Sequence, residues 1–364
     1  MKAGIVGLPN VGKSTLFNCL SNAKAQSANF PFCTIEPNIG VVNVPDPRLL
    51  KLEELVNPER VQPATVDIVD IAGLVKGASK GEGLGNQFLG NIRECNAIIH
   101  VLRCFDNDNI VHVDGSVNPI RDKETIDIEL QLKDLDTVDK RLEKAKKTAK
   151  VGNKEAQAEV ALLERIKEAL LQAKSARTVV PQNDDEVKLL ESFQLITTKP
   201  VLYVCNVDEG AAATGNKYVE QVRELVKDEN AEVMYLAVGT EADITELETY
   251  EERQMFLEDL GLTEPGASAL IRSAYKLLSL QTYFTAGVKE VRAWTINIGD
   301  TAPQAAGVIH TDFEKGFIRA EVIAYDDYVA YGTEAKVKEA GKLRVEGKEY
   351  IVKDGDVMHF RFNV

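Results

Sequence analysis

The sequence Gly7-Leu-Pro-Asn-Val-Gly-Lys-Ser14 decides the fold, because it is a complete G-x-x-x-x-G-K-[ST] phosphate-binding loop. It follows a short apolar run with Ala3, Ile5 and Val6, and it precedes the helically spaced apolar residues of Thr15–Leu20. A strand that leads through a glycine-rich turn into a helix directs backbone N–H groups and the positive end of the helix dipole at one point. The sequence therefore predicts a binding site for a nucleoside phosphate.

The side chains of this loop fit that chemistry. Lys13 supplies a positive charge for the β- and γ-phosphates, and Ser14 supplies a hydroxyl for Mg²⁺. Gly12 lets the backbone approach the phosphates closely. A glycine turn ahead of an ordinary helix is the alternative, and the strand–loop–helix context argues against it.

Length and composition describe a globular protein of two or three domains, with 364 residues, 44% hydrophobic and 27% charged. No run approaches 18 apolar residues and no signal-peptide pattern opens the chain, so we expect a cytoplasmic protein that does not contact a membrane. The formal charge of −14 argues against broad nucleic-acid affinity but not against a local basic patch. The five cysteines lack C-x-x-C spacing, which argues against a zinc site and a disulfide framework.

Changes in composition divide the chain into three regions. Strand-like runs alternate with glycine-rich loops and helical stretches in the first region, which is typical of an α/β sheet. The expected strands are Lys2–Gly7, Ile39–Val44, Thr65–Ile71, Ala97–Leu102, Val201–Cys205 and Val233–Val238. We predict an α/β nucleotide-binding domain at 1–122 and 199–280, a helical insertion at 123–198, and a small α+β domain at 281–364.

The insertion is rich in Glu, Lys, Ala and Leu between about Glu124 and Arg177. Its apolar residues recur at helical spacing, and Gly152-Asn153 breaks the pattern. We therefore predict two helices that form an antiparallel coiled-coil hairpin. The apolar positions are Leu135, Val138, Leu142, Ala145, Val160, Leu163, Ile166 and Leu170.

Further groups suited to a phosphate site follow in order along the chain. Asp70 ends an apolar strand and can hold Mg²⁺ through water, while the N–H of Gly73 can contact the γ-phosphate. The glycine-rich loop Lys76–Gly85 suits a segment that changes state with the nucleotide, although an idle flexible loop is the alternative. Thr34 could complete the Mg²⁺ shell, or it could be a turn residue.

The element that recognises the base is predicted at Asn206-Val-Asp-Glu209. GTPases place Asn-Lys-x-Asp here, and this chain has Val207 for the lysine and Glu209 for the aspartate. Val207 lacks the long stem that packs on the base, and Glu209 is too long to accept both guanine donors in the same place. Adenine reverses the donor and acceptor pattern on that edge, so we expect ATP to be preferred over GTP.

The residue after Asp70-x-x-Gly73 is Leu74, whereas Ras-like GTPases have a glutamine that orients water there. A leucine cannot polarise water, so the catalytic group must come from elsewhere. His112 lies between the fourth strand and the hairpin and is a candidate. A half-buried polar residue in a connecting loop is the alternative.

Together these motifs closely resemble the YchF family, the Obg-like ATPases. The resemblance rests on residues 7–14, 30–38, 70–74 and 206–209, and residues 281–358 look like the family's TGS domain, a β-grasp module. It implies a P-loop NTPase with a helical hairpin insertion and a C-terminal TGS domain. It also implies hydrolysis of ATP in preference to GTP, and association with ribosomes. We expect a monomer.

The resemblance also implies roles for individual residues. It places the phosphates at Asn10, Val11, Gly12, Lys13, Ser14 and Thr15, and Mg²⁺ at Ser14 and Thr34. It implies a contact between Val207 and adenine, and it matches His112 to the family's proposed catalytic histidine. Asn10 matches an asparagine that holds K⁺ in potassium-activated relatives. A departure occurs at Leu236–Glu241, where relatives often carry a Ser-Ala-Lys-like run, so base contacts there would rest on backbone groups.

Two other functions stay open at this point. One is an Obg-type GTPase, which the same phosphate machinery would serve. The other is a ribosome- or RNA-docking module whose nucleotide is a structural ligand. Docking is favoured by a basic cluster on the hairpin, whose alternative is a solvated helix face with interleaved acidic residues. The cluster comprises Lys140, Arg141, Lys144, Lys146, Lys147 and Lys150.

Overall fold

The computed structural model describes residues 1–22, 39–71, 73, 76–80 and 85–363. Thr34 and Leu74 lie outside the described residues. Contacts divide the chain into two compact units. The first unit holds the described residues of 1–22, 39–40 and 67–270, and the second holds those of 41–66 and 271–363.

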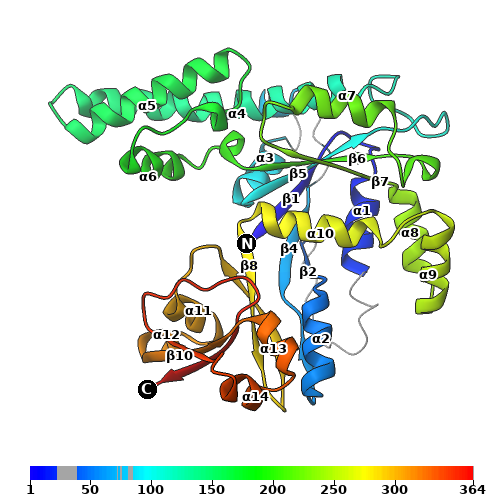
Figure 1. Ribbon diagram of the computed structural model, residues 1–364. Coiled ribbons are helices and arrows are strands. Elements are labelled where there is room, and N and C mark those ends of the chain that lie inside the picture. The colour runs from blue at the N-terminus through cyan, green and yellow to red at the C-terminus, as the bar shows by residue number, and fades with distance from the viewer. Residues whose placement is uncertain (23–38, 72, 74–75, 81–84, 364) are drawn as a thin grey trace. The chain divides into compact units, whose positions relative to one another are not determined.

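The sheet that carries the phosphate loop has the strand order β2-β4-β1-β5-β6-β7 (Figure 1). β1 pairs in parallel with β4 and β5, and β6 pairs in parallel with β5 and β7. Every residue of β5 and β6 is buried, as expected for central strands of a parallel sheet covered on both faces. The strands are β1 Lys2–Val6, β2 Ile39–Asn43, β4 Thr65–Asp70, β5 Ala97–Arg103, β6 Val201–Asn206 and β7 Glu232–Leu236.

Two helices of this unit begin soon after strands of the sheet end, α1 after β1 and α8 after β7. α1 starts at Lys13, directly after the glycine loop. The expected strand Val233–Val238 is too long, because β7 ends at Leu236 and Val238 begins a helix. The helices and short turns are α1 Lys13–Asn22, η1 Ala78–Lys80, α3 Gly85–Glu94, η4 Glu209–Ala211, α7 Lys217–Val226, α8 Val238–Glu246, α9 Tyr250–Asp259 and α10 Gly266–Leu277.

The insertion forms the predicted helical hairpin from α4 (Pro119–Ala149) and α5 (Lys154–Leu171), which lie side by side in Figure 1. α4 starts earlier than the expected Glu124, because Asn118 caps the helix and Pro119 suits its first turn. The predicted apolar positions pack together, and helix α6 (Asp184–Phe193) adds Phe193 to the same core. A two-helix coiled coil is therefore an incomplete description. Short turns η2 (Ala176–Thr178) and η3 (Ile196–Thr198) flank α6.

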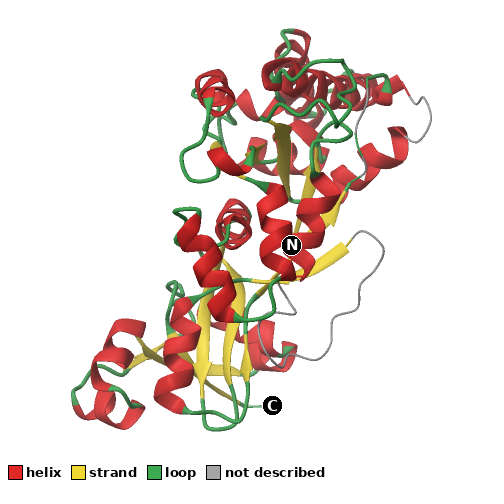
Figure 2. Cartoon of the chain, turned by 90° about the vertical axis from the view of Figure 1, so that its right-hand side faces the viewer, coloured by secondary structure: helices red, strands yellow, loops and turns green. Residues whose placement is uncertain are grey.

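The second unit has its own sheet, in the order β11-β10-β12-β8-β9-β3. Figure 2 shows helices along its strands, and the small side chains of α11 pack with those strands in one core. β3 pairs with β9, so the short segment 61–62 joins this sheet from far upstream. The elements are α2 Pro47–Val56, β3 Val61–Gln62, β8 Leu280–Ala286, β9 Val291–Asn297, α11 Ala302–Ile309, α12 Thr311–Lys315, β10 Phe317–Ile323, α13 Tyr325–Tyr331, α14 Glu334–Glu339, β11 Arg344–Glu346 and β12 Val357–Phe362.

The predicted fold class is confirmed: a phosphate-loop α/β sheet, an inserted helical hairpin and a C-terminal α+β unit. The exact domain boundaries remain predictions. Among the described residues, no helix combines the length and apolarity needed to cross a bilayer.

Candidate nucleotide-binding site

The phosphate loop joins β1 to α1 in a backbone shape that requires glycine at Gly12. Gly12 has a φ of 100°, and a Cβ atom added there would lie 2.6 Å from Asn206 Nδ2. Asn10 also adopts a left-handed φ, of 61°, which asparagine tolerates better than most residues. The strand, the strained loop and the helix start therefore form the anion-binding geometry that the sequence predicts.

Lys13 is buried beneath this loop, and its Nζ donates to the carbonyl of Leu8 at 2.7 Å. Burial lowers the pKa of Lys13 to about 8, although the nearby charge of Asp70 acts in the opposite direction. A buried amine without a full counter-charge suits a site that takes up a polyanion. A phosphate group would provide that counter-charge.

Ser14 and Asp70 meet at the end of β4. Ser14 Oγ donates to Asp70 Oδ2 at 3.0 Å, whereas the buried Asp70 Oδ1 has no hydrogen-bond partner among the described groups. A hydroxyl next to a carboxylate with a spare buried oxygen fits the oxygen ligands that Mg²⁺ prefers. Gly73 is close as well, because a Cβ added there would lie 3.0 Å from Pro9 N. The Asp70-x-x-Gly73 turn thus lies against the phosphate loop.

A cavity of about 510 Å³ extends from the phosphate loop toward the predicted base-recognition element. It brings together six residues predicted from the sequence: Asn10, Gly12, Thr15, Asn206, Val207 and Glu209. Its other lining residues come from the loop after β5, from the turn after β6 and from the start of α8: Phe105, Asp106, Asn107, Ile110, Asp208, Ala237, Val238, Gly239, Thr240 and Asp243. Four carboxylates and no lysine or arginine are among the residues that line it.

Asn206 fixes the walls of this cavity. Its Nδ2 donates to Val11 O at 2.9 Å, and its Oδ1 accepts from the N–H of Val238 at 3.0 Å. The side-chain amide thus ties the phosphate loop to the start of α8. These two bonds fix the amide in the cavity wall and leave its second Nδ2 hydrogen for a ligand.

The rest of the predicted base-recognition element divides into buried and exposed groups. Val207 is buried, and its N–H donates to Leu236 O, so its carbonyl is the backbone group left for a ligand. Asp208 accepts from the N–H of Ala211 and caps a short turn. Glu209 is exposed at the cavity. Glu241, in the predicted base-contacting stretch Leu236–Glu241, lies in α8 and accepts from the N–H groups of Gly266 and Ala267.

Sequence reasoning missed Arg103, which shapes the loop between β5 and His112. Arg103 is almost fully buried, and its guanidinium donates to three backbone carbonyls of this loop, those of Phe105, Asn107 and Ile110. The guanidinium also lies 4.7 Å from the centre of the Phe105 ring. The available signal was a single charged residue at the end of the apolar run Ala97–Leu102.

His112 lies in this same stretch, next to the phosphate loop in the chain's fold. Asn10 Nδ2 donates to Val111 O at 3.2 Å, which holds the loop at the nucleotide site. The imidazole itself is buried, with Nε2 2.8 Å from Asp122 Oδ2 and Nδ1 accepting from the N–H of Asp114. His112, Asp114 and Asp122 form a cluster, and Arg121 contacts both carboxylates and offsets one of their two negative charges.

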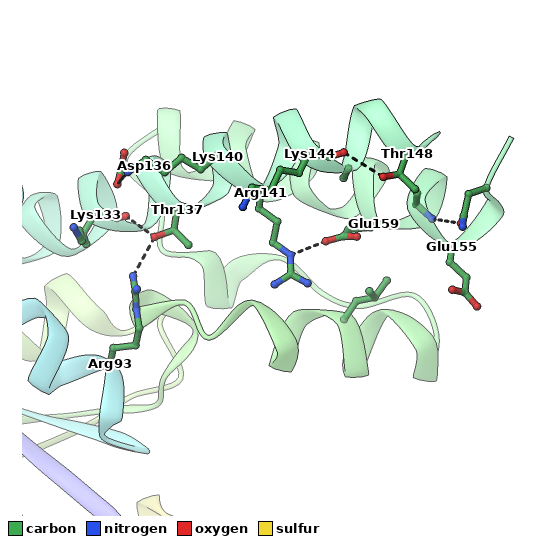
Figure 3. A pocket seen from close by; sticks show the side chains of 14 residues that line it. Arg93, Lys133, Asp136, Thr137, Lys140, Arg141, Lys144, Thr148, Glu155 and Glu159 are labelled. Carbon is green, nitrogen blue, oxygen red and sulfur yellow. Dashed lines mark hydrogen bonds and ion pairs between the residues drawn. The ribbon is translucent and has the colours of Figure 1, made fainter. Parts of the chain in front are cut away.

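The hairpin carries a groove of about 780 Å³ with a mixed charge pattern (Figure 3). Part of the predicted basic cluster is paired: Lys140 with Asp136, Arg141 with Glu159, and Lys146 with Glu164. Arg93 from α3 reaches the same groove and donates to Thr137. The basic side chains that line the groove are Arg93, Lys133, Lys140, Arg141 and Lys144.

Comparison with known proteins adds independent findings. A family model described as a 50S ribosome-binding GTPase matches residues 2–238, and a YchF-GTPase C-terminal model, described as a protein of unknown function (DUF933), matches residues 280–363. Similar proteins include the Ribosome-binding ATPase YchF of Haemophilus ducreyi (58% identical) and that of Bacillus subtilis (56% identical). These matches cover 100% of this chain and 99% and 100% of the two relatives.

A solved structure agrees with these matches over the whole chain. The structure of the Schizosaccharomyces pombe YchF GTPase superposes with a TM-score of 0.89 at 39% identity, covering 99% of this chain and 97% of that one. Some of these similar proteins are therefore named as ATPases and another as a GTPase.

Proposed function

Because the chain belongs to the YchF family, we propose that it binds ATP with Mg²⁺, hydrolyses it, and acts on ribosomes as a nucleotide-dependent switch in the cytoplasm. The observation that carries this proposal is the single cavity that joins the phosphate loop to Asn206–Glu209. Family membership makes it a P-loop hydrolase of nucleoside triphosphates. The preference for ATP, the metal ion and the roles of individual residues are our inferences.

We assign the roles from the position of the phosphate loop and from family membership. Asn10 to Thr15 would bind the phosphates, Ser14 would hold Mg²⁺ and Asp70 would hold it through water. The sequence adds Thr34, outside the described residues, as a further ligand. When bound, Mg²⁺ would neutralise charge on the β- and γ-phosphates. Gly73 contacts the γ-phosphate, and His112 orients or deprotonates the attacking water. Asn10 also offers an amide oxygen for K⁺.

The donors and acceptors around the cavity favour adenine. The oxygen of the Asn206 amide accepts from the N–H of Val238, and one of its two Nδ2 hydrogens goes to Val11 O, so a single N–H is left to donate to a base. The carbonyl of Val207 and the carboxylates along the wall can accept from the exocyclic amino group of adenine. These oxygens would face guanine O6, which is itself an acceptor, so guanine would not gain the contact that adenine gains.

A GTP preference has one observation in its favour. The N–H groups of Gly239 and Thr240, in the first turn of α8, have no partner within the helix, and both residues line the cavity. They could donate to guanine O6. This makes the nucleotide preference a matter for direct measurement.

The deciding experiment is competition of unlabelled ATP and GTP against a labelled nucleotide, with Mg²⁺. We expect ATP to compete more strongly in the wild type, and Glu209→Asp combined with Val207→Lys to shift the preference toward GTP. Stronger competition by GTP in the wild type would assign the chain to the GTPases. Hydrolysis is measured in parallel, with Lys13→Ala as the inactive control.

Ribosome association has a candidate surface in the hairpin groove, since Lys133, Lys140 and Lys144 lie along one side of it (Figure 3). Co-sedimentation with ribosomes at increasing salt tests this surface. If it contacts RNA, the variant Lys133→Glu/Lys144→Glu binds more weakly and with a shallower salt dependence. Lys174→Glu/Lys188→Glu, with two exposed lysines outside the groove, is the control matched in charge. Equal binding by both variants would place the contact elsewhere.

A further inference from the structure

The imidazole of His112 is held by a hydrogen bond at each ring nitrogen. The N–H of Asp114 donates to Nδ1 at 3.1 Å, so Nδ1 bears the lone pair and the proton of the neutral ring lies on Nε2. Nε2 then donates to Asp122 Oδ2 at 2.8 Å. A base or water-orienting group needs an unengaged lone pair. In this arrangement His112 has none.

The apolar residues on either side of His112 are exposed, whereas the polar imidazole is buried. Val111 and Val113 are 75% and 51% exposed, whereas the side chain of His112 is 5% exposed. Turning the loop so that the imidazole leaves its pocket would let an exposed valine take a more buried place. The hydrogen bonds to the imidazole oppose that turn, together with those that Ile110 O and Val111 O accept from Arg103 and Asn10. Asn10 and Val111 meanwhile keep the loop beside the phosphates.

Asp122 can hold the imidazole because its carboxylate is itself fixed. Arg121 Nε and Nη2 donate to Oδ1 at 3.2 and 3.0 Å, which leaves Oδ2 for His112. Asp122 lies in the first turn of α4, which begins at Pro119. Any shift of that turn moves the acceptor away from Nε2.

The same face of α4 contacts a second segment of the nucleotide site. Glu129, seven residues or two helical turns after Asp122, accepts from the N–H groups of Gly77 and Ser79 at 2.7 and 2.8 Å. Gly77 and Ser79 follow the Asp70-x-x-Gly73 turn. One helix thus holds both His112 and the loop that follows the γ-phosphate contact. The same helix continues into the hairpin groove.

We propose that Asp122 is a positioning residue for ATP hydrolysis, which withholds His112 until a shift in the first turn of α4 releases it. This rests on the proposed role of His112. Helix α4 then converts an event on the hairpin into release of the group that acts on water. We therefore expect the isolated protein to hydrolyse ATP slowly, and a partner bound to the hairpin to accelerate hydrolysis.

The test compares ATP hydrolysis by full-length Asp122→Ala, Asp122→Asn and His112→Ala, with Mg²⁺ and without ribosomes. We expect both Asp122 variants to raise kcat at least about tenfold, within the range of general acid–base effects, with KM nearly unchanged. Asp122→Asn leaves no cavity. Its amide has one oxygen, for which Arg121 and the Nε2–H of His112 compete. The exposed Glu124→Ala, on the same turn, is the control.

The double variant Asp122→Ala/His112→Ala decides whether the increase in kcat depends on His112. If it does, the double variant should show none of the increase that Asp122→Ala shows. Nitrogen-15 spectra of the imidazoles add a direct readout, since the chain has four histidines. The wild type should show Nε2 protonated and Nδ1 unprotonated for His112. The Asp122 variants should show an imidazole that exchanges between tautomers.

The outcomes distinguish the withholding by Asp122 from the proposed role of His112, on which it rests. If the double variant Asp122→Ala/His112→Ala keeps the increase that Asp122→Ala gives, the proposed role of His112 is wrong, and the role of Asp122 is wrong with it. If His112→Ala lowers kcat and the Asp122 variants lower it too, His112 keeps its role and the withholding by Asp122 is overturned. A wild-type spectrum with Nδ1 protonated would also overturn it.

Discussion

The hydroxyl of Ser14 lies 3.0 Å from Asp70 Oδ2, which joins the start of α1 to the end of β4 at the predicted metal site. The second carboxylate oxygen of Asp70 is buried without a partner among the described groups. We predict that Asp70→Asn raises the Mg²⁺ concentration for half-maximal hydrolysis at least about tenfold. A magnesium titration of hydrolysis measures this. Asp67→Asn on the same strand is the control, and an unchanged Mg²⁺ requirement in Asp70→Asn would exclude Asp70 from the metal site.

The buried Lys13 predicts a pH dependence of nucleotide affinity. Its pKa is lowered to about 8, so the amine is protonated below this pH and neutral above it. Only the protonated amine attracts phosphate, and bound phosphates would raise its pKa. The affinity for ATP should therefore fall as the pH rises through 8, by up to about tenfold per unit. Measuring Kd for ATP between pH 7 and 9.5 tests this. In Lys13→Met, the fall in affinity that comes from deprotonation of Lys13 should be absent.

Arg103 predicts a linked effect on stability and nucleotide binding. Arg103→Met would leave three loop carbonyls without their donor, at a cost of about 2–4 kcal/mol in the free energy of unfolding. KM for ATP should rise, because the same loop carries Phe105 into the cavity. Urea unfolding and hydrolysis kinetics measure the two effects. Arg60→Met, at an exposed position, should change neither the stability nor KM. If Arg103→Met is destabilised but keeps a normal KM, the loop does not contribute to ATP binding.

The sequence predicted the residues that act through local geometry better than those that act across strands. Lys13 and Ser14 follow from one loop and the helix after it, so the motif alone placed them. Asn206 is predicted to contact the base, and the structure adds that its amide joins Val11 to Val238. That contact depends on the parallel register of strands far apart in the sequence, which no short pattern contains.

Asp122 and Phe193 show the same limit in the insertion. Asp122 looks like an ordinary acidic residue in the first turn of a helix, where it would favour the dipole. Its contact with His112 depends on how the preceding loop folds back. Helical spacing predicted the apolar stripes of α4 and α5, whereas the contribution of Phe193 needs the return path of α6.

The core of the hairpin predicts different stability effects for two leucines of the same helix, α5. Leu163 is fully buried among α4, α5 and α6, whereas Leu171 at the end of α5 is 65% exposed. Leu163→Ala should lower the free energy of unfolding by about 2–4 kcal/mol, through lost burial and the cavity left behind. Thermal unfolding measures this. Leu171→Ala should have little effect, and equal losses in both variants would contradict the packing described for this core.

Glu129 predicts a measurable link between the hairpin and the loop after Gly73. Its buried carboxylate accepts from two backbone N–H groups, those of Gly77 and Ser79. Glu129→Ala removes both acceptors, so hydrogen exchange at these two amides should accelerate, while exchange in the core of β5 and β6 stays slow. The exposed Glu124→Ala, on the same helix, should leave both regions unchanged. Slow exchange at Gly77 and Ser79 in Glu129→Ala would show that other contacts hold the loop. Fast exchange would mean that α4 is its anchor, and that a movement of the hairpin reaches the nucleotide site through this carboxylate.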